Sequence, residues 1–231
     1  MIALKNVTVK AGSFTLQDVS FTVPQGAFAS VVGAAGSGKT TMLEAVAGVR
    51  ELSTGAITFG NNDVTHCAPE HRGVGLVYQH GALFPHKSVA ENIRWASSDD
   101  KTVAPIVERL GISRLFATPV SALSGGERQL VALARALVRV SERLKAGRPA
   151  VLLLDEPFSA LDPRRRVATR EVVHAFHNEW KLTTLHVTHD GADARRADFV
   201  VLLDSGQVVQ CGAPNDLLAN PLREDVVLFL S

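Results

Sequence analysis

Apolar and polar residues alternate along the start of the chain, and this pattern predicts short, half-buried antiparallel strands up to residue 23. Turns are expected at Gly12 and at 24–26, where glycine and proline interrupt the alternation. A wholly apolar run at 28–32 predicts a buried strand, and the apolar spacing after it predicts a helix that ends near Gly48. The first part of the chain is therefore expected to contain an antiparallel β subdomain.

Strands and helices alternate further along. Ser88 and Glu91 have the spacing of a capping box, so a helix is expected to start there, and residues 88–145 are mostly of helical pattern. Asp162 followed by Pro163 predicts another helix start. This alternation indicates the α/β class, a parallel sheet with helices on both sides. Short strands are predicted at 56–59, 73–78, 151–154, 184–188, 199–203 and 207–210.

The composition narrows the class of protein. The chain has 231 residues, 46% of them hydrophobic, which suits one compact domain or one domain with an inserted lobe. A net charge of +1 provides no overall field that would attract nucleic acid, so no nucleic-acid partner is expected. Cys67 and Cys211 lack metal-ligand spacing, which favours a reduced, intracellular protein. No apolar run approaches the roughly 18 residues that a membrane span needs.

One stretch has the spacing of a phosphate-binding loop, a glycine, four further residues and then Gly-Lys-Thr. Its glycines permit tight, partly left-handed angles and leave no Cβ between the backbone N–H groups and a ligand. These groups and the positive end of the next helix would form an anion site. Lys39 would reach the outer phosphates, and the Thr40 hydroxyl would coordinate Mg²⁺. The alternative is a flexible turn before a lysine. The loop comprises Gly33, Ala34, Ala35, Gly36, Ser37, Gly38, Lys39, Thr40 and Thr41.

Two carboxylates follow the buried strand at 151–154, at the edge of the sheet where α/β proteins bind ligands. Asp155 would hold Mg²⁺ through its water shell, and Glu156 would polarise an attacking water. The alternative is that both acids only form part of the turn that follows the strand. A phosphate-binding loop upstream favours the catalytic interpretation.

A second glycine pair lies at the start of a predicted helix. Ser124 and Glu127 have capping-box spacing, which by itself has a structural explanation. A cap does not require the two consecutive glycines, Gly125 and Gly126. Each glycine loses more conformational entropy on folding than another residue would, so a further reason for them is expected. Bare amides and a hydroxyl at a helix N-terminus can bind an anion. Two phosphate sites with only one nucleotide pattern suggest that the second site serves another subunit.

Together these motifs resemble those of the ATP-binding cassette (ABC) transporter ATPases, in that family's order and over essentially the whole chain. The resemblance implies a P-loop NTPase core with a mixed central sheet, the antiparallel β subdomain and an inserted α-helical subdomain. Within a single ABC ATPase domain, the core would comprise 1–85 and 146–231 and the helical signature subdomain 86–145. The motifs are 33–40, Gln79, 123–127, 154–157, 159–162 and His189.

The resemblance also implies ATP and Mg²⁺ as cofactors and a head-to-tail homodimer with two ATP molecules in its interface. Ser124, Gly125 and Gly126 of one subunit would close on the γ-phosphate that the partner subunit's Lys39 holds. In the second site of the dimer, the chain's own Lys39 would hold the γ-phosphate on which the partner subunit closes with the same three residues, called the signature residues below.

Four single residues receive roles only from the resemblance. Gln79 would sense Mg²⁺ and the attacking water, His189 would contact the γ-phosphate, and Asp162 would cross the dimer interface. Phe14 would stack on adenine, because Ala11 stands where the family often has an aromatic residue. Glu127 replaces the commoner glutamine, a variant that the family is expected to tolerate.

Within the family the chain looks like the importer type. The segments 69–73, 83–86 and 185–190 are most similar to molybdate and tungstate importer ATPases, whereas 156–162 is shared with thiamine and iron importers. The resemblance implies a peripheral protein on the cytoplasmic face of the membrane. It would act with integral membrane permease subunits and indirectly with a substrate-binding protein. At 231 residues, the regulatory domain that many importers append is not expected in this sequence.

Two other functions remain open from the sequence. A soluble ABC ATPase of DNA repair or translation is one, although the chain lacks the coiled-coil insertions or paired cassettes that such proteins usually carry. A nucleotide-switched regulatory module is the other, and the intact Glu156 and His189 argue against it. The apolar segment 82–85 beside Gln79 is expected to receive a helix of the membrane subunit.

Overall fold

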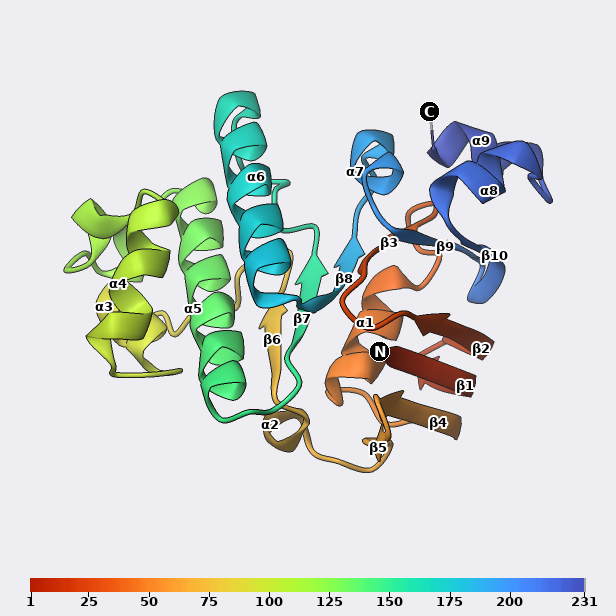
Figure 1. Cartoon of the computed structure of the whole chain (residues 1–231), viewed down its shortest axis with the longest axis horizontal. Coiled ribbons are helices and arrows are strands. Elements are labelled where there is room, and N and C mark those ends of the chain that lie inside the picture. Colours follow the sequence, from red (N-terminus) through yellow and green to blue (C-terminus); the bar gives the residue numbers. More distant parts are fainter. Residues whose placement is uncertain (231) are drawn as a thin grey trace. The chain divides into compact units, whose positions relative to one another are not determined.

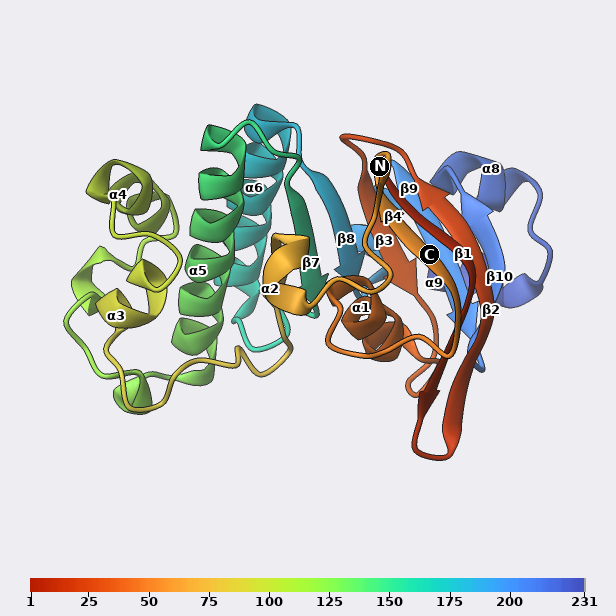
Figure 2. The same ribbon diagram turned by 90° about the horizontal axis from the view of Figure 1, so that it is seen from below.

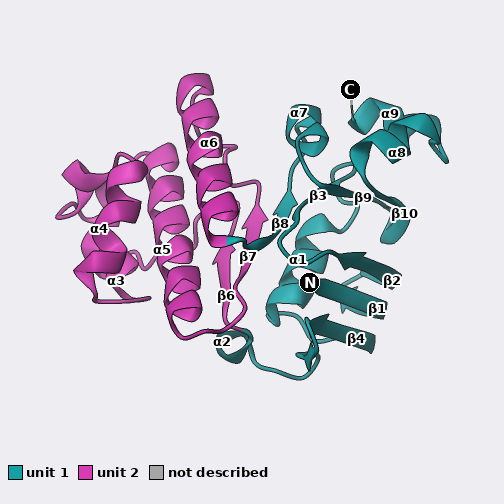
Figure 3. Cartoon of the chain, viewed as in Figure 1, with its two compact units in different colours: residues 1–72, 181–231 teal, residues 73–180 magenta. Residues whose placement is uncertain are grey.

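The computed structural model describes residues 1–230 and divides the chain into two compact units. The first unit contains residues 1–72 and the chain from 181 onward, and the second contains residues 73–180 (Figure 3). The boundaries of the helical subdomain, predicted at residues 86 and 145, stay a prediction. The two units are defined by compactness and do not correspond to that subdomain and its core. No helix within residues 1–230 is long and apolar enough to cross a bilayer.

An antiparallel sheet forms one layer of the first unit, with the strand order β2-β1-β4-β5. Ile2 pairs with Val23 on one side and with Phe59 on the other, and the large apolar side chains of β1 are buried while the residues between them are more exposed. The predicted antiparallel β subdomain is thus confirmed. Its strands are β1 (Ile2–Ala11), β2 (Phe14–Val23), β4 (Thr54–Phe59) and β5 (Asn62–Asp63).

A second group of strands in the first unit is mostly parallel. β3 lies between β8 and β9 and pairs with both in parallel, so Val31 has Val187 and Val201 as its neighbours. All five residues of β3 and all five of β8 are buried, as expected for central parallel strands. β10 pairs antiparallel with β9 and makes the sheet mixed. The strands are β3 (Phe28–Val32), β8 (Thr183–Val187), β9 (Phe199–Asp204) and β10 (Gln207–Gly212).

Five helices complete the described part of the first unit. α1 packs on β1 and on β8 and therefore joins the antiparallel strands to the parallel ones, while α7 packs on β3 (Figure 1). α1 ends at Gly48, whose left-handed φ of 81° allows its N–H to reach carbonyls of the last turn. α2 and α7, of four and five residues, were not expected because they are too short to show a helical period. The helices are α1 (Lys39–Ala47), α2 (Pro69–Arg72), α7 (Gly191–Arg195), α8 (Pro214–Ala219) and α9 (Glu224–Phe229).

The second unit combines two parallel strands with the longest helices of the chain. β6 and β7 pair in the register Val77 to Leu154. α5 packs on β6 and lies between α3 and α4 on one side and α6 on the other (Figures 1 and 2). The elements are β6 (Val74–Val77), α3 (Val89–Arg94), α4 (Asp100–Arg109), η1 (Ser113–Leu115), η2 (Val120–Ala122), α5 (Gly125–Lys145), β7 (Val151–Asp155) and α6 (Pro163–Trp180).

The helix starts expected from the sequence are present in the second unit. Both capping boxes form, since the side chains of Ser88 and Ser124 accept from backbone N–H groups and the glutamates three residues later bond back. Oδ1 of Asp162 accepts from the backbone N–H of Arg165 at 3.0 Å, so Asp162 caps α6 as predicted.

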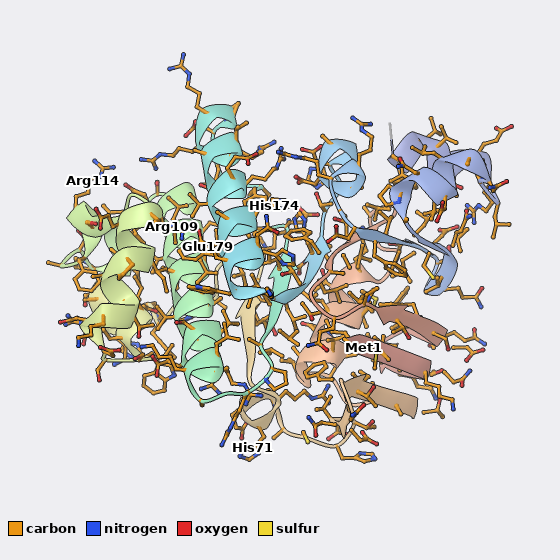
Figure 4. All side chains as sticks on the ribbon, viewed as in Figure 1. Met1, His71, Arg109, Arg114, His174 and Glu179 are labelled. Carbon is orange, nitrogen blue, oxygen red and sulfur yellow. The ribbon has the colours of Figure 1, made fainter. Side chains whose placement is uncertain are left out.

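A bidentate ion pair joins α4 to α6. Arg109 donates to both carboxylate oxygens of Glu179, at 2.7 and 2.9 Å, and its guanidinium lies 3.9 Å from the ring centroid of Phe176. Arg109 and Glu179 are labelled in Figure 4. The fork geometry and the stacked ring favour arginine over lysine at this position.

Arg72 fixes the C-terminal end of α1. Its buried guanidinium donates to the carbonyls of Ala45 and Val46 in the last turn of α1, at 2.8 and 3.0 Å. It also donates to the carbonyls of Thr65 and Cys67, each at 3.0 Å. A cation at this end of a helix complements the helix dipole as well as the open carbonyls. Because α1 begins at the phosphate-binding loop, Arg72 anchors the far end of the helix that carries this loop.

We expect Arg72→Met to lower the free energy of unfolding by about 3 kcal/mol, because buried carbonyls lose charged donors. Arg50→Met is the matched control, since the Arg50 side chain is 39% exposed and pairs with a single carboxylate, that of the 17% exposed Glu44. Its loss should cost at most about 1 kcal/mol. Urea denaturation of both variants checks this, and equal losses would contradict the anchoring role of Arg72.

Candidate functional site

The predicted phosphate-binding loop connects β3 to α1, and its glycines serve different purposes. A Cβ at Gly33 would lie 2.0 Å from the carbonyl oxygen of Leu203, and one at Gly38 would lie 2.7 Å from the Phe14 ring. Gly36 has no atom within 4 Å of the position of an added Cβ, although its φ is +78°. All three glycines have a positive φ, as expected from the sequence, but two of them also lie against other parts of the fold. Gly33 and Gly38 are already required by the packing of the first unit.

Lys39 is folded into this loop. Its ammonium donates to the carbonyls of Gly33 and Ala34, each at 2.8 Å, and the side chain is buried. The Ser37 hydroxyl is also buried and has no hydrogen-bond partner among the described residues. Residues 34–36, by contrast, are exposed. A buried cation, an unsatisfied hydroxyl and an exposed loop at a helix N-terminus fit an anionic phosphate group.

His189 leaves the sheet at the same edge as this loop. The N–H of Thr188 donates to the carbonyl of Val31 at 3.2 Å, so the ends of β8 and β3 run side by side. His189 itself is exposed, and Asp190 after it caps α7 by accepting from the N–H of Ala192 at 2.9 Å. The first unit therefore brings His189 and the phosphate-binding loop to one edge of the parallel strands.

In the second unit, Glu156 and Gln79 contact each other. β7 ends at the buried Asp155, and Glu156 follows it, while Gln79 follows β6. The Gln79 amide donates to the Glu156 carboxylate at 3.3 Å. Glu156 has a φ of +44°, a left-handed conformation that a residue with a side chain adopts at a cost of about 1–3 kcal/mol. Strain of this kind is concentrated at functional sites.

Gln129 was not identified from the sequence, yet it joins three of the predicted motifs. Its buried amide donates to the backbone carbonyl of Glu156 at 2.9 Å and to that of Gln79 at 3.4 Å. Its amide oxygen accepts from the N–H of Ala160 at 3.1 Å. The available signal was a polar residue beside the apolar face of α5, but sequence alone does not tell which groups such a residue reaches.

The signature residues lie at the N-terminus of α5 and contact the loop before α6. A Cβ at Gly126 would lie 3.0 Å from the carbonyl oxygen of Ala160, a tight contact that an alanine could make only if its neighbours moved by a few tenths of an ångström. A Cβ at Gly125 would meet only the Ala160 methyl, at an ordinary 3.8 Å. Gly125 also needs no left-handed φ, and it lies at a helix start where alanine would cost less entropy. The fold of the second unit therefore does not account for Gly125.

The three residues expected to hold Mg²⁺ come from both units. Thr40 belongs to the first unit, and Gln79 and Asp155 belong to the second. Among residues 1–230, no group of three or more histidine, cysteine, aspartate or glutamate side chains is arranged to hold a metal ion. A hydroxyl, an amide oxygen and a carboxylate are oxygen donors of the kind Mg²⁺ prefers, so the residue types fit. The joint arrangement of the three stays a prediction.

Comparison with known proteins gives the family. The ABC transporter family model matches residues 16–159, which include the phosphate-binding loop, the signature residues and both strand-end carboxylates. The sulfate/thiosulfate import ATP-binding protein CysA of Mycobacterium bovis is 38% identical over 99% of this chain. CysA of Nocardia farcinica is 36% identical over the whole chain and is covered to 70% of its own length. The chain spans 66% of the mycobacterial relative.

Among solved structures, the dimeric post-hydrolysis state of the ATP-binding cassette MJ0796 bound to ADP and Pi superimposes with a TM-score of 0.80. It is 26% identical and covers 92% of this chain and 98% of its own. The chain therefore belongs to the ABC transporter family, and its fold is the α/β fold of ABC cassettes. The resemblance and the P-loop NTPase fold class predicted from the sequence are both confirmed.

We expect Gln129→Leu to lower the free energy of unfolding by about 1–3 kcal/mol, because buried backbone groups lose their partners. Gln210→Leu is the control, since Gln210 also bonds two backbone groups, those of Asn220 and Leu222, but does so at the surface. Its loss should cost less than about 1 kcal/mol. Thermal unfolding monitored by circular dichroism checks the difference. Similar values for both variants would remove the central role given to Gln129.

Proposed function

We propose that the chain is the ATP-binding and ATP-hydrolysing subunit of an ABC importer. The observation that carries this proposal is the contact of Gln79 with Glu156 where two neighbouring parallel strands end. Membership of the ABC transporter family supports it, and so do the names of the relatives as import ATP-binding proteins.

The phosphate-binding loop would hold the triphosphate. The exposed amides of residues 34–36, the N-terminus of α1 and Lys39 supply positive charge, and the unsatisfied Ser37 hydroxyl can bond to a phosphate oxygen. Thr40, Asp155 and Gln79 would hold Mg²⁺, which neutralises phosphate charge when it is bound. Phe14, a half-buried ring in contact with Gly38, is the proposed partner of adenine.

Glu156 would act as the general base. It accepts a proton from water as the water oxygen attacks the γ-phosphorus, and the bond to the bridging oxygen breaks to give ADP and phosphate. Gln79, already bonded to this carboxylate, would orient the water. His189, at the edge where the phosphate-binding loop emerges, would contact the γ-phosphate. Gln129 supports the arrangement by holding the backbone of Glu156.

A head-to-tail homodimer would complete two such sites. Ser124, Gly125 and Gly126 would close on the γ-phosphate bound by the partner subunit's Lys39, and Asp162 would lie at the interface. Gly125 supports this, because packing within the second unit does not require a glycine there. The related cassette MJ0796 is described as dimeric with ADP and Pi.

The cargo proposed is a tetrahedral oxyanion. Segments of this chain resemble molybdate and tungstate importer ATPases, whereas the similar proteins from Mycobacterium and Nocardia are named for sulfate and thiosulfate. A substrate-binding protein and the membrane permease subunits would select among these ions, with this chain as a peripheral subunit on the cytoplasmic face. Uptake of labelled sulfate and of labelled molybdate by cells that co-express the permease distinguishes them. A soluble ABC ATPase would support neither uptake.

An aromatic and cationic surface on the second unit is the proposed docking site for a permease helix. The Phe84 ring lies 5.0 Å from that of Trp95, which is 67% exposed, and the Lys87 ammonium lies 5.7 Å from the Trp95 ring. Buried Asn92 holds the backbone of Phe84 from both sides, accepting from its N–H at 2.8 Å and donating to its carbonyl at 3.2 Å. The loop conformation therefore does not depend on the Phe84 ring.

We expect Phe84→Ala to weaken co-purification with the permease subunits about tenfold or more, while the isolated subunit still folds and binds ATP. An aromatic anchor at the centre of an interface typically contributes 2 kcal/mol or more. Val167→Ala is the control, since Val167 is 55% exposed on α6 and lies outside this surface. Normal recovery of the Phe84→Ala complex would count against the docking site.

The catalytic assignment is tested with Glu156→Gln, which keeps the shape of the side chain but cannot accept the proton. Turnover should fall by about 10²- to 10⁴-fold. ATP should still bind, so the variant is expected to accumulate as an ATP-bound dimer in gel filtration at saturating ATP. Lys39→Ala should stay monomeric under the same conditions. Hydrolysis near the wild-type rate in Glu156→Gln would move the base role to another residue.

A further inference from the structure

The hydroxyl of the signature serine is already engaged within the chain. Ser124 Oγ donates to Oε2 of Glu127 at 2.9 Å, and the N–H of Ser124 donates to the same oxygen at 3.0 Å. In return, Ser124 Oγ accepts from the N–H of Glu127 at 3.3 Å. A hydroxyl has one proton, so in this arrangement the proton of Ser124 is committed to a carboxylate.

A cation from another element completes this arrangement. Arg114, in η1 and labelled in Figure 4, donates to Oε1 of Glu127 at 3.3 Å. The Arg114 side chain is 68% exposed, whereas that of Glu127 is only 18% exposed. Bonds from Ser124 hold the pKa of Glu127 below its usual range, and the charges of Arg114 and Arg165 act in the same direction. Glu127 therefore remains ionised at neutral pH.

Ionised Glu127 has two consequences for an incoming γ-phosphate. A hydrogen bond to a carboxylate is about twice as strong as one between neutral groups. The Ser124 hydroxyl therefore turns away from Glu127 toward a phosphate less readily than it would turn away from a glutamine. The phosphate also brings negative charge close to the carboxylate, which raises the free energy of the closed state. Arg114 reduces the second effect by compensating the charge of Glu127.

We propose that Glu127 restrains closure of the signature loop on the partner's ATP, and that Arg114 is the positioning residue that limits this restraint. The proposal rests on the function proposed above, because it concerns the same nucleotide-dependent dimer. It assigns a role to the carboxylate at position 127 beyond that of a helix cap. Glutamine forms the same capping box without a charge, so Glu127→Gln separates the two roles.

The experiment is a double-mutant cycle in the Glu156→Gln background, where ATP-bound dimers are expected to persist. The ATP concentration at half-maximal dimerisation is measured by light scattering for Glu127→Gln, Arg114→Gln and the combination of both. We expect Glu127→Gln to lower this concentration roughly threefold to tenfold and Arg114→Gln to raise it by a similar factor. Arg114→Gln should have no further effect once Glu127 is neutral. Arg114→Lys should restore most of the wild-type behaviour, because it keeps the charge.

Two further measurements exclude a purely structural effect. Thermal unfolding of each variant should be close to that of the parent, whereas Glu127→Ala, which breaks the capping box, should be less stable. With Glu156 intact, Glu127→Gln should lower the KM for ATP more than it changes kcat. The effect of Arg114→Gln should shrink in high salt, because exposed charges are screened.

The outcomes are distinct. An unchanged or higher ATP requirement in Glu127→Gln overturns the restraint, and an effect of Arg114→Gln that persists in the Glu127→Gln background overturns the role of Arg114. Either result leaves the proposed function standing as long as the Glu156→Gln parent dimerises with ATP. If the parent does not dimerise and the wild type does not hydrolyse ATP, the proposed function fails and this inference fails with it.

Discussion

The register between neighbouring parallel strands decides which side chains can meet at the candidate site. In the first unit, β3 and β8 pair so that Val31 lies beside Val187, and the phosphate-binding loop and His189 emerge at one edge. In the second unit, the pairing of Val77 with Leu154 lets Gln79 reach Glu156. A shift of one residue in either pair would turn the alternate side chains to the other face.

Backbone packing limits the residues of the site as strongly as ligand chemistry does. Gly33 faces the carbonyl of Leu203 and has no room for a side chain even without a nucleotide, whereas Gly126 lies close to the carbonyl of Ala160 and leaves little room. Gly36 and Gly125 have room and are exposed. The fold therefore requires Gly33 and crowds Gly126, and a φ of +78° favours glycine at Gly36, whereas neither space nor φ requires a glycine at Gly125.

Buried polar groups connect the elements that carry these motifs. Arg72 ties the end of α1 to the chain before α2, and Gln129 ties α5 to the loops that follow β6 and β7. Both residues bond mainly to backbone carbonyls, which fixes the path of the chain rather than one side chain. The strained φ of Glu156 is held in this way by the Gln129 amide and the Ser159 hydroxyl, both bonded to its carbonyl.

Local signals in the sequence determined the elements and the motifs. The alternation of β1 and β2, both capping boxes and the Asp162 cap are short-range patterns, so the residues that define them are neighbours along the chain. The spacing from Gly33 to Thr40 fixed the phosphate-binding loop for the same reason. Asp155 and Glu156 were identified as candidates because α/β proteins bind ligands at strand ends, and Ser124 because the two glycines after it exceed what a helix cap needs.

Only the tertiary structure decided how distant residues meet. The four backbone groups that Arg72 bonds, the three motif segments that Gln129 joins and the pairing of Arg114 with Glu127 depend on packing between separate elements. Likewise, the sequence could not divide the glycines by purpose, because the atoms that crowd Gly33 and Gly38 come from β9 and β2. Local patterns record the preferences of the backbone, whereas contacts across the fold depend on strand register and helix packing that many residues set together.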